Sequence, residues 1–279
     1  MNVARQSHTA STLPNGKVLV IGGWNNNGTL SDTELYDPTT RTWEKTKNMN
    51  IPRKYHTAQL LPTEKVLVIG GQNYNDYLNS AELYDPITDI WTNTGNMNVA
   101  RKYHTTLILS TGKVLVIGGQ GYSGYLNSAE LYDPLTGIWK NTGNMTIPRQ
   151  FHTATVLSNG KVLVTGGYSY SGSLSSAELY NPLTGTWQTT GYMIAARQYH
   201  TATILSDGDV LVTGGNDLSS NEKSAELYNS LENIWTIVKD MSVARAYHTA
   251  SVLSNRNVLV SGGYDSSGSL NSAELYIPY

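Results

Sequence analysis

The stretch ARKYHTTLILSTGKVLVIGG, residues 100–119, decides the fold because the chain repeats it at a fixed interval. PRKYHTAQLLPTEKVLVIGG stands 48 residues earlier, at 52–71, and PRQFHTATVLSNGKVLVTGG stands 48 residues later, at 148–167. All methionines and all histidines keep this interval: Met1, Met49, Met97, Met145, Met193 and Met241; His8, His56, His104, His152, His200 and His248. A constant period of this length is the signature of a repeat architecture.

Each repeat contains four short segments with strand character and none with helical periodicity. In the first repeat they lie at 8–13, 17–23, 33–38 and around Trp43. The second segment, KVLVIGG, is a continuous apolar run, which is typical of a strand covered on both faces. Turn residues separate the segments. Four strands per unit, repeated six times, predict an all-β fold: a six-bladed β-propeller of four-stranded blades.

We interpret residues 1–279 as a single propeller domain. Its repeats lie at 1–48, 49–96, 97–144, 145–192, 193–240 and 241–279. The sixth repeat stops at Tyr279 and lacks the tryptophan-bearing fourth strand within this chain. Either the sixth blade has three strands and an exposed edge, or a preceding segment of a longer protein supplies the missing strand. The second alternative is favoured here, because Met1 is the methionine of the repeat itself.

The motifs of the repeat resemble those of the Kelch repeat. R-x-x-H-T is followed by G-K-V-L-V-x-G-G, then by A-E-L-Y-D-P, and a tryptophan stands nine residues after the glutamate, as in Glu34 and Trp43. This variant is similar to the Kelch units in the propeller of galactose-oxidase-like proteins, and the similarity covers the whole chain. The resemblance implies that the loops between the second and third strands surround one mouth of a channel, where partners bind.

Three repeated positions have a direct physical interpretation. The glycine pair Gly22–Gly23 is expected where a side chain would clash or where φ must be positive. Tyr36 and Trp43 are large apolar groups with one polar tip, suited to the space between blades. Glu34 and Arg5 recur in equal number, and since a buried carboxylate needs a partner, we expect them to meet, with contacts across blades as one option.

The composition excludes several classes of function. The net charge is -2, which argues against a nucleic-acid partner. The chain has no cysteine, so that disulfides, a thiolate nucleophile and cysteine-ligated metals are excluded. No apolar run approaches the length of a membrane span, and no signal peptide is visible, which leaves the compartment open. We expect a monomer without a membrane partner.

The ring of six histidines is the sharpest chemical question. First strands line the channel of a propeller, so that six imidazoles there could hold a metal or relay protons. We favour a structural role, in which each histidine stands beside Thr9 or its equivalent and hydrogen-bonds to its own or the next blade. Metal sites usually combine three or four ligands of mixed type and so break the symmetry of a repeat. The six histidine positions show no departure from the repeat.

No catalytic residue, cofactor or metal is predicted. Copper-radical oxidation needs a crosslinked cysteine, which is absent. GQGYSG, residues 119–124, matches G-x-G-x-x-G, but a strand rather than a helix is expected to follow it, so we do not interpret it as a dinucleotide site.

The repeats differ most in the loop between the second and third strands. The loops contain these candidate ligand-binding residues: Trp24, Tyr74, Tyr77, Tyr122, Tyr125, Tyr168, Tyr170, Asp217 and Tyr264. Aromatic residues in polar, Gly/Ser-rich loops combine rigid contact area with adaptable hydrogen bonding, although they could also just pack over the loop stem. The fifth loop, which carries Asp217, is the charged exception.

We predict a non-catalytic binding or scaffold module that presents the tyrosine-rich loops to a protein or carbohydrate ligand. The alternative is a propeller domain of a larger carbohydrate-active or oxidase-like enzyme whose catalytic part lies outside this chain. A third possibility is a repeat protein without a dedicated ligand. Function by analogy of fold is an association only.

Overall fold

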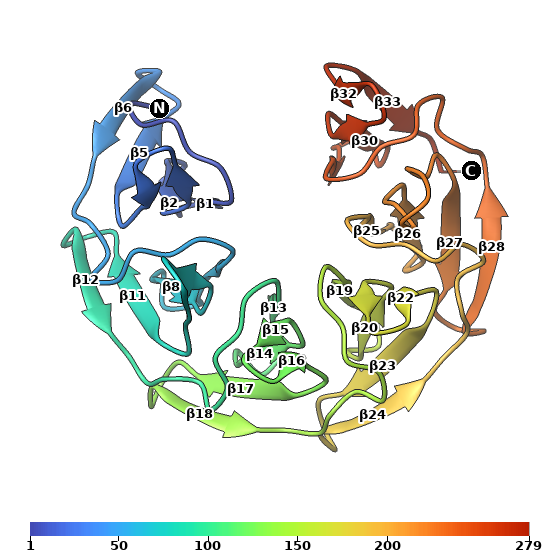
Figure 1. Cartoon of the computed structure of the whole chain (residues 1–279), viewed down its shortest axis with the longest axis horizontal. Helices are drawn as coiled ribbons and strands as arrows, with labels where there is room; N and C mark the ends of the chain where they lie inside the picture. The colour runs from blue at the N-terminus through green and yellow to red at the C-terminus, as the bar shows by residue number, and fades with distance from the viewer. Residues whose placement is uncertain (279) are drawn as a thin grey trace. The chain divides into compact units, whose positions relative to one another are not determined.

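The computed structural model describes residues 1–278, which form strands and turns and no helix. The strands build five four-stranded sheets, one three-stranded sheet and five two-stranded hairpins (Figure 1). The predicted fold class is therefore confirmed: an all-β, six-bladed propeller whose sixth blade has three strands. Among the described residues, no helix is available that could cross a membrane.

Residues 1–142 form one compact unit with three blades. The first blade consists of β1 (Thr9–Thr12), β2 (Val18–Ile21), β5 (Thr33–Asp37) and β6 (Thr42–Lys45). The second blade consists of β7 (Thr57–Leu60), β8 (Val66–Ile69), β11 (Ala81–Asp85) and β12 (Ile90–Asn93). The third blade consists of β13 (Thr105–Ile108), β14 (Val114–Ile117), β17 (Ala129–Asp133) and β18 (Ile138–Asn141).

Residues 143–279 form the other compact unit. The fourth blade consists of β19 (Thr153–Val156), β20 (Val162–Thr165), β23 (Ala177–Asn181) and β24 (Thr186–Thr189). The fifth blade consists of β25 (Thr201–Ile204), β26 (Val210–Thr213), β27 (Ala225–Asn229) and β28 (Ile234–Val238). The sixth blade consists of β29 (Thr249–Val252), β30 (Val258–Ser261) and β33 (Ala273–Tyr276).

The segments expected to be plain loops between the second and third strands contain short hairpins. The hairpins are β3 (Trp24–Asn25) with β4 (Gly28–Thr29), β9 (Gln72–Asn73) with β10 (Asp76–Tyr77), β15 (Gln120–Gly121) with β16 (Gly124–Tyr125), β21 (Tyr168–Ser169) with β22 (Gly172–Ser173), and β31 (Tyr264–Asp265) with β32 (Gly268–Ser269). Alternation over two residues is too short to be recognised as a strand in the sequence. GQGYSG lies in one of these hairpins and is followed by β17, so that the element after the motif is a strand, as expected, and not a helix.

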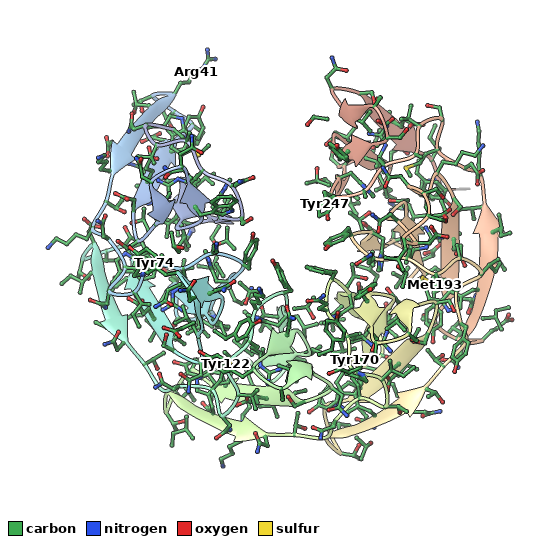
Figure 2. All side chains as sticks on the ribbon, in the orientation of Figure 1. Arg41, Tyr74, Tyr122, Tyr170, Met193 and Tyr247 are labelled. Carbon is green, nitrogen blue, oxygen red and sulfur yellow. The ribbon has the colours of Figure 1, made fainter. Side chains whose placement is uncertain are left out.

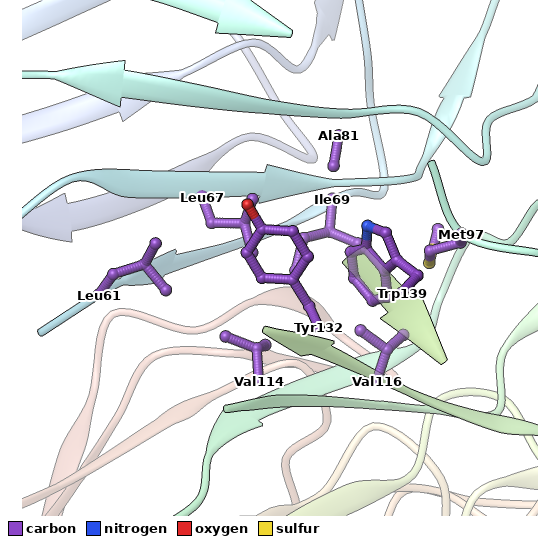
Figure 3. Close-up of a cluster of buried hydrophobic side chains, with 9 residues drawn as sticks. All are labelled: Leu61, Leu67, Ile69, Ala81, Met97, Val114, Val116, Tyr132 and Trp139. Carbon is purple, nitrogen blue, oxygen red and sulfur yellow. The ribbon is translucent and has the colours of Figure 1, made fainter. Parts of the chain in front are cut away.

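Neighbouring strands of every blade pair antiparallel, and the second strand is the most deeply buried. All four residues of β14 are buried, since the strand lies inside its sheet and both of its faces are covered. The core of the third blade contains Val114, Val116, Tyr132 and Trp139 and continues into the second blade through Leu67 (Figure 3). The continuous apolar run therefore forms the core strand that the sequence predicted.

In the first five blades the tyrosine and the tryptophan pack together, and in the second to fifth blades the indole N–H donates to a carbonyl in the connection before the blade. The ring centroids of Tyr132 and Trp139 lie 4.9 Å apart. The indole N–H of Trp139 donates to the carbonyl of Gly95 at 2.7 Å. Gly95 stands in the link between the second and third blades, so that the predicted position of these rings between blades is confirmed.

Among residues 1–278, the buried arginine and glutamate of each repeat form an ion pair within one blade rather than across blades. Arg101 Nη2 lies 2.9 Å from Glu130 Oε1, and both side chains are inaccessible to solvent. The glutamate is held further by the backbone N–H groups of Asn98 and Val99. Arginine and glutamate meet in the same blade because the segment before the first strand, which carries the arginine, lies beside the third strand, which carries the glutamate.

Candidate functional site

Four of the six histidines link neighbouring blades within one unit: His56, His104, His200 and His248. His56 Nε2 lies 2.9 Å from the hydroxyl oxygen of Thr9, and His104 Nε2 lies 2.9 Å from that of Thr57. In the other unit, His200 is hydrogen-bonded to Thr153 at 2.9 Å. Each of these histidines thus contacts the threonine of the preceding blade, so a structural hydrogen bond forms as expected, but with the preceding blade rather than with the histidine's own or the next one. A cluster of three or more metal-ligating side chains does not occur among residues 1–278.

Burial keeps the imidazoles of His56, His200 and His248 neutral. Desolvation and, to a smaller degree, the charge of Arg245 lower the pKa of His248 to about 4. Burial likewise lowers the pKa of His56 and His200 well below the ordinary value. A neutral imidazole is suited to a fixed hydrogen bond with a hydroxyl group, as the geometry shows.

We expect acid to destabilise the chain between pH 6.5 and about 4. His248 takes up a proton at pH 6.5 when unfolded but only near pH 4 when folded, so the stability that it contributes is lost as pH falls through this window. The slope is up to about 1.4 kcal/mol per pH unit for each such histidine. Urea unfolding across this window measures it, and His248→Gln should reduce the slope. A stability that stays constant over the window would contradict the assignment.

The aromatic residues that precede five of the histidines form a ladder within each unit, which the sequence analysis missed. In residues 1–142, the rings of Tyr55 and Tyr103 lie 4.5 Å apart. In residues 143–279, the rings of Phe151 and Tyr199 lie 4.2 Å apart, and those of Tyr199 and Tyr247 lie 4.0 Å apart and stacked. The signal was present in the sequence, because an aromatic residue precedes the histidine in five of the six repeats.

The backbone of the ladder is held in an unusual conformation. Tyr55 and Tyr103 have φ of 57° and 56°, in the left-handed region that bulky residues rarely adopt. The conformation lets Tyr55 N donate to Ser7 O at 3.2 Å, and Tyr103 N to Tyr55 O at 3.4 Å. Such conformations cost about 1–3 kcal/mol and cluster at functional sites. The backbone of the ladder thus links neighbouring blades, and its aromatic side chains lie next to one another in a row.

Two lysines lie among the aromatic rings of residues 1–142. The Lys54 ammonium lies 4.9 Å from the centroid of the Trp24 ring. The Lys102 ammonium lies 5.0 Å from the Tyr77 ring and 4.9 Å from the Tyr103 ring. We call the set Trp24, Lys54, Tyr55, Tyr77, Lys102 and Tyr103 the aromatic–lysine surface. It joins the predicted hairpin residues Trp24 and Tyr77 to the ladder.

The electrostatics of this surface favour an anion. Burial lowers the pKa of Lys102, and the like charge of Lys54 lowers it further. Lys102 Nζ also donates to Gln72 Oε1 at 3.0 Å, which fixes its position. In residues 143–279 the three counterparts of these lysines are Gln150, Gln198 and Ala246, so the two units differ in charge at this repeat position.

The other predicted residues of the first unit extend the aromatic–lysine surface. Tyr77 packs edge-on against Tyr122 with centroids 4.9 Å apart. Tyr122 donates to Asp76 Oδ1 at 3.4 Å. Tyr74 and Tyr122 are 66% and 70% exposed (Figure 2). Tyr125 is half-buried in β16.

The predicted residues of the second unit are more dispersed. Tyr168 lies in β21, and Tyr170 at the turn after it is 71% exposed (Figure 2). Tyr264 lies in β31 and is exposed. Asp217 accepts hydrogen bonds from the N–H groups of Ser219 and Ser220. The carboxylate of Asp217 therefore holds its own turn together, which gives it a structural task in addition to any contact with a ligand.

The family of the chain follows from the motifs that build these blades. Residues 92–263 match the family model described as the KLHDC2/KLHL20/DRC7 Kelch-repeats domain. The chain belongs to the Kelch-repeat family. Residues 7–50 and 62–98 also match the Kelch motif. A comparison with curated proteins gave no match. Kelch domains are in general non-catalytic modules that bind other proteins, and the chain has the propeller fold of such a scaffold.

Proposed function

We propose that this Kelch propeller is a non-catalytic module that binds an acidic segment of a partner protein on its aromatic–lysine surface. The observation that carries the proposal is the pair of half-buried lysines packed among aromatic rings. A carboxylate placed between Lys54 and Lys102 would relieve the repulsion between the two ammonium groups. Charge-assisted hydrogen bonds of this kind are stronger than neutral ones.

The tyrosines around the two lysines supply the apolar part of the proposed interface. Tyrosine buries large area at low entropic cost and is enriched in the cores of interfaces. The proposed contact residues around the two lysines are Trp24, Tyr74, Tyr77, Tyr122 and Tyr125, all in residues 1–142. Tyr168, Tyr170, Asp217 and Tyr264 are proposed as contact residues of residues 143–279 taken by themselves. The acidic side chains of the ligand would lie over the lysines, and its apolar side chains over these rings.

The test is a peptide array of Asp/Glu-rich sequences with matched Asn/Gln-rich controls, followed by fluorescence polarisation at low and high salt. The variant Lys102→Met keeps the aliphatic stem and removes the charge. It should weaken binding of an acidic peptide at least about tenfold, equivalent to about 1.4 kcal/mol, and should reduce the salt dependence.

The matched control is Lys113→Met in the same blade. Lys113 follows the β13–β14 turn, at the opposite end of the sheet from the hairpins, and pairs with Asp133. This variant should bind as the parent does. Equal binding of the acidic and amide peptides would contradict the proposal. A neutral oligosaccharide that binds the hairpins without loss in Lys102→Met would replace the protein ligand with a carbohydrate.

A further inference from the structure

One position of the repeat carries a lysine in the third blade and an alanine in the sixth. Lys102 stands directly before Tyr103, and Ala246 stands directly before Tyr247. The remaining repeats hold a long polar side chain at this position: Gln6, Lys54, Gln150 and Gln198. Ala246 is therefore the member of the series whose side chain ends at Cβ.

The third blade shows what the lysine does at this position. Lys102 Nζ donates to Gln72 Oε1 of the preceding blade at 3.0 Å. The same ammonium group lies 4.9 Å from the centroid of the Tyr103 ring, within the range of a cation–π interaction. An amide oxygen and a tyrosine ring thus bind one ammonium group where two neighbouring blades meet.

The second unit keeps both partners of such an ammonium group. Asn216 is the counterpart of Gln72, and Tyr247 is the counterpart of Tyr103. Asn216 Oδ1 is buried and accepts no hydrogen bond from the residues that the structure describes. A buried acceptor without a donor costs free energy. The missing donor is the one that Lys102 supplies in the third blade.

The backbone around Ala246 has the same geometry as the backbone around Lys102. Lys102 exchanges two backbone hydrogen bonds with Gln120, at 3.0 and 2.8 Å. Ala246 exchanges two with Tyr264, also at 3.0 and 2.8 Å. The side-chain amide of Asn221 in the fifth repeat donates to Tyr264 O at 2.9 Å, which joins the loops of the two blades. The two places therefore differ in the side chain that Ala246 lacks.

The two loops beside Ala246 carry carboxylates. Asp217 directly follows Asn216, and Asp265 lies in the hairpin of the sixth blade. The hydroxyl groups of Ser219 and Ser267 donate to these carboxylates at 2.7 and 2.6 Å. These hydrogen bonds lower the pKa of both aspartates, so both are negatively charged at neutral pH.

Two cations of the second unit are already paired and do not cancel this charge. Arg245 Nη2 lies 2.9 Å from Glu274 Oε1, and Lys223 Nζ lies 3.6 Å from Asp240 Oδ2. The counterparts of Lys54 and Lys102 in this unit are uncharged. The electrostatic potential at these loops therefore favours a cation.

We propose that the second unit binds the ammonium group of a lysine side chain from a partner segment between Asn216 and Tyr247. The ammonium group donates to Asn216 Oδ1 and lies over the Tyr247 ring, as the ammonium group of the third blade does with its own two partners. Asn216 is half-buried, and the terminal torsion of an asparagine is soft, so its amide oxygen can turn toward a ligand. The site is separate from the aromatic–lysine surface, which takes a group of opposite charge.

The test uses the full chain and a capped Gly/Ser peptide with one central lysine, followed by NMR titration. We expect saturable binding of one peptide per chain, and binding at least about threefold weaker for the peptide in which norleucine replaces lysine. Lys102→Met should leave this binding unchanged, because the site does not depend on the acidic ligand proposed for the aromatic–lysine surface. Equal binding of the two peptides would overturn the proposal.

Two variants distinguish this site from a diffuse attraction to carboxylates. Asn216→Leu and Tyr247→Leu each remove one partner of the ammonium group and keep every carboxylate. Each variant should weaken binding of the lysine peptide at least about threefold. If both variants bound the peptide as the parent does, the proposed site would be wrong.

A variant at Ala246 provides a test that needs no ligand. Ala246→Lys supplies the ammonium group from the chain itself, as Lys102 does, and should abolish binding of the lysine peptide. Its unfolding midpoint in urea should exceed that of Ala246→Met, which has a long stem and no charge. An Ala246→Lys chain that is no more stable than Ala246→Met would contradict the proposal.

Discussion

Replacement of Arg101 by alanine is expected to destabilise the chain by about 3–5 kcal/mol. The guanidinium donates to Gly118 O at 2.7 Å and to Ser128 O at 3.0 Å, and it pairs with Glu130. Its loss leaves the Glu130 carboxylate buried without a countercharge, together with two buried carbonyl groups without their donor. The unfolding midpoint in urea, followed by circular dichroism, measures the effect.

An exposed ion pair in the same blade provides the control for Arg101→Ala. Lys113 Nζ and Asp133 Oδ2 lie 3.4 Å apart, with the lysine side chain 43% exposed. Solvent screens such a pair, so Lys113→Ala should change the midpoint little. The double variant Arg101→Met with Glu130→Leu removes both charges and should recover part of the loss. Equal effects of Arg101→Ala and Lys113→Ala would contradict the structural role of the buried pair.

The second large effect is expected from Gly70→Ala. Gly70 has φ of 57°, and a Cβ atom there would lie 2.7 Å from the carbonyl oxygen of Arg101. That carbonyl accepts the N–H of Gly71 at 2.8 Å, so it cannot move without loss of the link between blades. The left-handed conformation costs about 1–2 kcal/mol and the overpacking about 1–3 kcal/mol more.

Gly112→Ala is the matched control for Gly70→Ala. Gly112 also has positive φ, 77°, but a Cβ atom there has no neighbour within 4 Å. It should therefore show only the conformational cost, about 1–2 kcal/mol. The difference between the two midpoints isolates the close approach of the blades. If Gly70→Ala and Gly112→Ala lowered the stability equally, the positive φ alone would explain why glycine recurs at this position of each repeat.

The local sequence predicted the long strands of the blades but not the short hairpins between them. The run KVLVIGG predicted the buried second strand, and β2, β8, β14, β20, β26 and β30 lie in its six copies. The hairpins such as β9 and β10 were not predicted, because two-residue strands have no period of their own. The single-domain interpretation of residues 1–279 stays a prediction, as does the role of the hairpin tyrosines in binding.

The candidate site was predicted only in part. The hairpin tyrosines were named from their variability between repeats, and Tyr77 and Trp24 do lie against lysines. The ladder of Tyr55 and Tyr103 was not recognised, because a repeated aromatic residue beside a histidine is as consistent with core packing as with a presented surface. Only its left-handed backbone and its contact with Lys102 set it apart.

The sequence by itself determined the number of blades, the order of the strands within them and the family, since these follow from a constant period and from local patterns of apolar and turn residues. The tertiary structure decided which groups meet. Arg101 finds Glu130 in its own blade, whereas His104 finds Thr57 in the preceding one. Residues 29 and 47 positions apart are brought together by strand register and blade packing, and no local propensity distinguishes one of these pairings from the other.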